Sequence, residues 1–130
     1  MVFGWDDSQQ AHDQVYVQGG GYDQPNEAKF SHEMIAGAAS FAGFKAFEDH
    51  QRNEGKPVSH AFAKELLAGF VGGEVDKLAE TKGMDFYDRE RAQHQAKESA
   101  GNMYDQHYVQ QQGADQYDPN QYGRPQQLNY

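Results

Sequence analysis

The sequence contains no cysteine. Disulfide bonds, thiolate nucleophiles and cysteine-ligated zinc or iron–sulfur centres are therefore excluded. A small secreted domain usually depends on disulfides, so their absence favours a reducing compartment. We expect a cytoplasmic protein.

Positive charge is also scarce, and the first basic side chain is Lys29. A secretory signal needs a basic start and a mitochondrial presequence needs arginine, so neither is indicated. The longest nearly apolar run covers residues 34–44, well short of the ~20 residues that span a bilayer. The net charge of -9 disfavours binding to nucleic acids, whose phosphates attract cations, and to anionic membrane surfaces.

Hydrophobic residues make up only 37% of the chain, and the mean hydropathy is -1.00. Seven of the eight phenylalanines lie within residues 26–108, whereas five of the eight tyrosines lie outside them. Phenylalanine favours a core, and tyrosine tolerates water. We therefore predict a flexible acidic segment over 1–25, a helical domain over 26–108 and a disordered Gln/Tyr-rich tail over 109–130.

The fold class predicted for the domain is all-α, with a core of three helices. The first covers about 26–50, where apolar or small residues recur at spacings of four and three. The second covers about 59–82, with Ser59 as its N-cap and Gly83 as its stop. The third covers about 85–108 and has an apolar stripe made mainly of alanine. Such a core is modest, so self-association would help to stabilise it.

The six histidines do not form a recognisable catalytic or metal-binding motif. None has a carboxylate three residues before it, as a di-iron helical bundle requires. Glu90, His94 and Glu98 share one helical face, which fits either an acid/base cluster or a solvated face, and we interpret it as solvated. A Ser31–His60 dyad across two helices remains an alternative. We expect no catalytic residue, metal or cofactor.

Glycines inside the first two helices are the more unusual feature, because each costs about 1 kcal/mol relative to alanine. Close approach of the two helices would compensate for this cost. The alternative is a groove that binds an apolar ligand or a partner helix. The candidate interaction or ligand surface consists of Gly37, Phe41, Gly43, Phe44, Gly69, Phe70 and Gly73.

A long ordered series of segments resembles the fungal CipC-like family, the concanamycin-induced protein C group. The segments are EAKFSHEMIAGAASF at 27–41, FEDHQ at 47–51, GKPVSH at 55–60, AKELLAGF at 63–70 and EVDKL at 74–78, together with FGW at 3–5. The resemblance implies a small cytosolic fungal protein associated with stress or antibiotic exposure. It implies no particular molecular activity and no catalytic residues.

Three functions follow from these observations, in order of preference. The first is a non-enzymatic stress-associated protein that acts by contact with a protein partner or by self-association. The second is a carrier that holds a small apolar ligand between the first two helices. The third is an enzyme that uses His/Glu pairs, such as His94 with Glu90.

Overall fold

The computed structural model describes residues 5–13, 32–83, 85–123, 125 and 128. In chain order the helices are α1 (Trp5–His12), α2 (His32–Glu54), α3 (His60–Lys82), α4 (Phe86–Tyr104) and the π-helix η2 (Asp105–Gln111). Over these described residues the all-α prediction and the three-helix core are confirmed. The predicted start of the first helix, near Asn26, lies outside the described residues.

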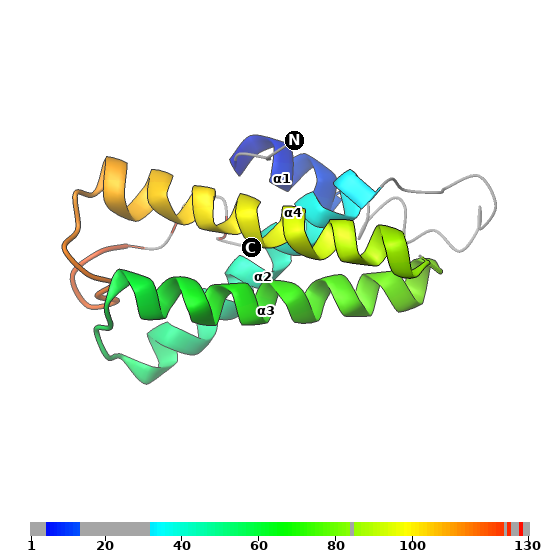
Figure 1. The fold of residues 1–130 in the computed structure, drawn as a ribbon. Coiled ribbons are helices and arrows are strands. Elements are labelled where there is room, and N and C mark those ends of the chain that lie inside the picture. The colour runs from blue at the N-terminus through cyan, green and yellow to red at the C-terminus, as the bar shows by residue number, and fades with distance from the viewer. Residues whose placement is uncertain (1–4, 14–31, 84, 124, 126–127, 129–130) are drawn as a thin grey trace.

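The helices α3 and α4 form an antiparallel hairpin, and α2 crosses behind both of them (Figure 1). Local signals define this hairpin. The Ser59 hydroxyl accepts a hydrogen bond from the amide of Phe62 at the start of α3. Gly83 ends α3 with φ +70°, which glycine adopts without strain. The Asp85 carboxylate then caps α4 by accepting from the amide of Asp88.

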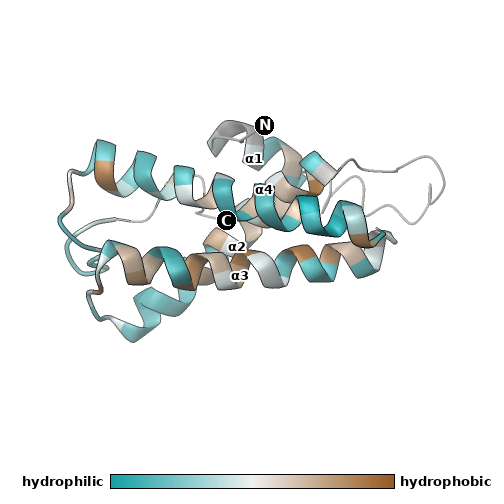
Figure 2. Ribbon diagram, in the orientation of Figure 1, coloured by the Kyte–Doolittle hydropathy of each residue, from teal (hydrophilic) through white to brown (hydrophobic). Residues whose placement is uncertain are grey.

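The core lies where α2 packs against the hairpin. Phe41, Phe44 and Phe47 of α2 are buried against it. From α4 the core receives mainly alanine, and accordingly α4 is largely hydrophilic while α3 carries more hydrophobic residues (Figure 2). The predicted thin stripe of α4 is confirmed, since its members are fully buried: Ala92, Ala96, Ala100 and Met103.

The N-terminal helix α1 packs on the core, although the composition predicted a flexible segment over 1–25. The Trp5 ring lies 4.8 Å from that of Phe44, and its indole Nε1 donates to the Met103 carbonyl over 3.1 Å. Ala11 is also buried. Burial of the Trp5 ring and the hydrogen bond of its N–H offset the entropic cost of ordering this short acidic helix. Residues 14–25 lie outside the described part of the chain.

The segment after α4 differs from the predicted disordered tail. Within 109–130, Tyr117 and Leu128 are fully buried, and Tyr117 forms an antiparallel backbone bridge with Val58. The free energy gained by burying these few large side chains offsets the cost of ordering a segment whose composition is mostly polar. Within the described residues, no helix is long and apolar enough to cross a membrane.

Candidate functional site

The most unusual side chain in the core is Glu48 of α2, which is fully buried. It lies one turn beyond Phe44, where the apolar stripe of α2 would otherwise continue. A buried carboxylate is very unfavourable unless donors surround it. Here Glu48 accepts from Arg52 Nε over 2.8 Å, from the Tyr108 hydroxyl over 2.5 Å and from the Tyr117 hydroxyl over 3.0 Å.

Arg52 connects this carboxylate to the C-terminal segment. Its guanidinium donates to the Tyr108 hydroxyl over 2.9 Å and to the carbonyls of Pro119 and Tyr122, each over 3.0 Å. Burial is the largest single influence on the pKa of Arg52 and would lower it, but the attraction to Glu48 together with the interactions with Tyr108 and Tyr117 raises it overall. The two bonds from Arg52 to these carbonyls, together with the bond from Tyr117 to Glu48, fasten residues 117–122 to α2.

The tyrosines of this cluster act as neutral donors. Burial is the largest cause that raises the pKa of Tyr108 and Tyr117 well above 10.0, and the negative charge of Glu48 raises both further. Burial likewise raises the pKa of Tyr104, with a smaller contribution from Glu48. Phenolate forms are therefore strongly disfavoured at this position in the fold.

His60 makes a second connection to the same segment. Its Nε2 lies 2.8 Å from the Ala114 carbonyl and its Nδ1 lies 2.6 Å from the Tyr104 hydroxyl. Because a carbonyl only accepts, Nε2 carries the proton, and in the neutral ring Nδ1 accepts from Tyr104. Both ring nitrogens are thus bonded, and Ser31, its predicted dyad partner, lies outside the described residues.

The buried polar network, defined as Glu48, Arg52, His60, Tyr104, Tyr108 and Tyr117, satisfies its own members. Its charged groups and hydroxyls contact one another or backbone carbonyls of the same chain. Such an arrangement stabilises and orients the fold. We assign the network a structural role, which is to hold the C-terminal segment on the helical core.

The face of α4 that bears Glu90, His94 and Glu98 is open to solvent. His94 has a side chain 81% exposed, and its Nε2 lies 3.7 Å from Glu98. Glu90 is also exposed. This geometry matches a solvated helix face. Nowhere in the described residues do three or more His, Asp or Glu side chains gather as metal ligands would.

The structure divides the predicted interaction surface into two parts. Gly37, Phe41, Gly43 and Phe44 of α2 are buried, so they cannot contact a partner from outside. At Gly43 a Cβ atom would lie 2.6 Å from Cα of Val71. This glycine therefore permits the close approach of α2 and α3. Because the two helices are in contact at this point, they leave no room here for the apolar ligand that was one of the two expectations.

The remaining members lie on α3. Gly69 and Gly73 are exposed, and a Cβ atom at either would meet no atom of the described part of the chain within 4 Å. Phe70 is half-buried against the ring of His50, with centroids 5.5 Å apart. Beside them, Phe62 and Leu66 line a hollow of about 290 Å³. Ligand pockets usually measure about 300–1,000 Å³, so this hollow is small for a carrier.

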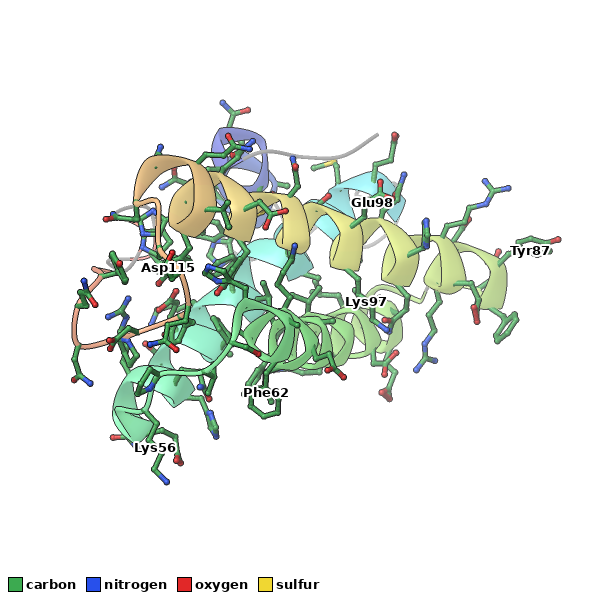
Figure 3. All side chains as sticks on the ribbon, turned by 60° about the vertical axis from the view of Figure 1, so that its left-hand side comes forward. Lys56, Phe62, Tyr87, Lys97, Glu98 and Asp115 are labelled. Atoms are coloured by element: carbon green, nitrogen blue, oxygen red, sulfur yellow. The ribbon has the colours of Figure 1, made fainter. Side chains whose placement is uncertain are left out.

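A larger groove of about 700 Å³ runs between α3 and α4. Gly69, Gly72 and Gly73 lie on its α3 side, and Phe86, 75% exposed, lines it from the start of α4. Some of its polar residues already bridge the helices, because Arg89 and Gln93 of α4 both donate to the Asp76 carboxylate of α3. Phe62 and Tyr87 project outward from the starts of α3 and α4 (Figure 3).

Sequence reasoning found the glycines of this groove but missed the buried polar network. A signal for the network was present, since Glu48 interrupts the phenylalanine stripe at i+4 from Phe44. Its tyrosine partners gave no signal, because Tyr117 lies 69 residues away. Only the folded chain brings them together.

The fold and these sites define a small all-α protein whose internal polar groups are structural and whose open groove lies between two helices. A family model described as "Virulence factor CipC-like" matches residues 11–107. The chain belongs to this CipC-like family, as the resemblance implied. No curated protein and no solved structure matches the chain.

Proposed function

We propose that this chain is a non-enzymatic, cytosolic, stress-associated protein that acts by binding another protein through the outer surface of α3 and α4. The observation that carries the proposal is the groove of about 700 Å³ between these helices, with Phe86 exposed at its edge. Exposed aromatic side chains beside a groove are typical of protein-binding surfaces. The absence of cysteine and the CipC-like resemblance support the cytosolic and stress-associated parts.

The distribution of reactive groups supports a binding role over catalysis. The buried groups with shifted pKa values, Tyr104, Tyr108 and Tyr117, belong to the structural network. Two of the groove's charged residues, Asp76 and Arg89, form a salt bridge of 2.8 Å, and Glu90 and Lys97 also line it. The groove thus presents apolar, glycine and polar surface, which suits a protein contact.

Site-specific photocrosslinking tests the proposal. A benzophenone amino acid is placed at Phe86, and the matched control carries it at Gln110, an exposed position on η2. In cells that make the chain, we expect position 86 to form discrete adducts with a protein and position 110 to form none. Equal labelling at both positions, or no adduct at 86, would contradict the proposal.

A further inference from the structure

An exposed row of side chains follows the outer face of α3 at intervals of four residues. It consists of Glu65, Gly69, Gly73 and Lys77. The row begins with a negative charge and ends with a positive one. Lys77 has a side chain 73% exposed, although its Nζ also lies 3.1 Å from Glu74 one turn earlier.

The arrangement of charges makes this row complementary to itself. Its centre lies between Gly69 and Gly73, and Glu65 and Lys77 stand at equal distances on either side. If a second copy of α3 lies antiparallel across the first, Glu65 of each copy faces Lys77 of the other. A parallel arrangement would instead place like charges together. The charges therefore point to a second copy of this chain and to one orientation of it.

Helix packing geometry allows these rows to meet. Rows of residues four apart align with one another when two helices cross at about -50°, the commonest class of helix packing. At the crossing point the two copies would present glycine to glycine, so the backbones could approach closely. Among the described residues, no atom lies within 4 Å of a Cβ built at Gly69 or Gly73, so none of them fills this space.

The groove beside the row provides further contact area. Phe86, Arg89 and Lys97 of α4 line its other side. Lys97 extends from α4 towards α3, where its Cε would lie 3.2 Å from a Cβ built at Gly72 (Figure 3). A second copy of α3 on the row would therefore also cover part of α4, including the exposed Phe86 ring.

We propose that two copies of this chain form a two-fold symmetric dimer in which the α3 helices cross antiparallel at Gly69 and Gly73. This inference rests on the proposed function, since it names the protein partner as a second copy. The glycines permit close approach, and the Glu65–Lys77 pairs select the antiparallel orientation.

A charge exchange tests the orientation in the full chain by analytical ultracentrifugation. We expect Glu65→Lys or Lys77→Glu to raise the dimer dissociation constant at least about tenfold, since each places like charges together. The combined Glu65→Lys/Lys77→Glu variant should restore wild-type affinity. The matched control for Glu65→Lys is Glu98→Lys, which changes the net charge by the same amount on another face and should leave dimerisation unchanged. Failure of the combined variant to restore affinity would overturn the antiparallel interface.

A second measurement separates the interface from folding. Gly69→Ala and Gly73→Ala should raise the thermal midpoint of the dilute monomer, because alanine favours a helix, and should weaken the dimer at least about tenfold. A substitution that raises both the thermal midpoint and the dimer affinity, or lowers both, would contradict the inference. Wild-type chain that stays monomeric up to about 1 mM would also overturn it. The proposed function would survive that result if position 86 still crosslinks to a different protein.

Discussion

Replacing Glu48 with alanine should destabilise the protein severely. The substitution removes the acceptor of three hydrogen bonds, from Arg52 and from the Tyr108 and Tyr117 hydroxyls. Removal of one partner from a buried ion pair costs about 3–5 kcal/mol, because the other charge remains without compensation. Small domains have free energies of unfolding of about 5–15 kcal/mol, so this loss is a large fraction of the total.

Urea denaturation followed by circular dichroism measures this change in the free energy of unfolding. The matched control is Glu98→Ala, which removes a carboxylate whose side chain is 55% exposed and should change stability by less than about 0.5 kcal/mol. The conservative variant Tyr117→Phe removes one donor to Glu48 and should cost about 1–2 kcal/mol. A loss below about 1 kcal/mol for Glu48→Ala would refute the idea that this network holds the C-terminal segment.

Three further predictions concern other parts of the molecule. Gly43→Ala should lower the free energy of unfolding, measured by urea denaturation, by about 1–3 kcal/mol or more, because its Cβ would overlap Val71. The control Gly101→Ala should not destabilise, since among the described residues its Cβ would meet only Lys64 Cε, at 3.8 Å. Trp5→Phe should cost about 1 kcal/mol by losing the hydrogen bond to Met103, and an unchanged thermal midpoint would contradict the packing of α1. Stability should be retained below pH ~10 and lost as pH rises further, because the unfolded chain then ionises three tyrosines that the fold keeps neutral: Tyr104, Tyr108 and Tyr117. Absorbance at 295 nm should show these tyrosines ionising together with unfolding. Ionisation of the three tyrosines without unfolding would contradict their burial.

The helical hairpin could be predicted because its signals are local. Ser59, Gly83 and Asp85 act within one turn of their own positions, as a cap, a left-handed stop and a second cap. The alanine stripe of α4 could also be predicted, from the helical spacing of its alanines. These features need no knowledge of which distant residues come together.

The ends of the chain could not be predicted in the same way. Tyrosine tolerates water, so composition alone does not predict that Tyr117 is buried. Its burial depends on a hydrogen bond to Glu48, which lies on another element. Likewise, nothing in the sequence distinguishes Gly43 from Gly69. Their difference is the position of Val71, which lies against the first and away from the second.

The bonds from α1 to Met103 have a consequence for synthesis. Trp5 and Ser8 bond to Met103 at sequence separations of 98 and 95 residues, and Tyr117 likewise bonds to the distant Glu48. Ribosomes add about 5–20 residues per second, so the first helix waits many seconds for its partner to emerge. During that interval Phe44 of α2 lacks its contact with Tyr104 of α4, although Trp5 of α1 is already available to pack against it. These long-range contacts can therefore form only after residues 103–117 have been synthesised.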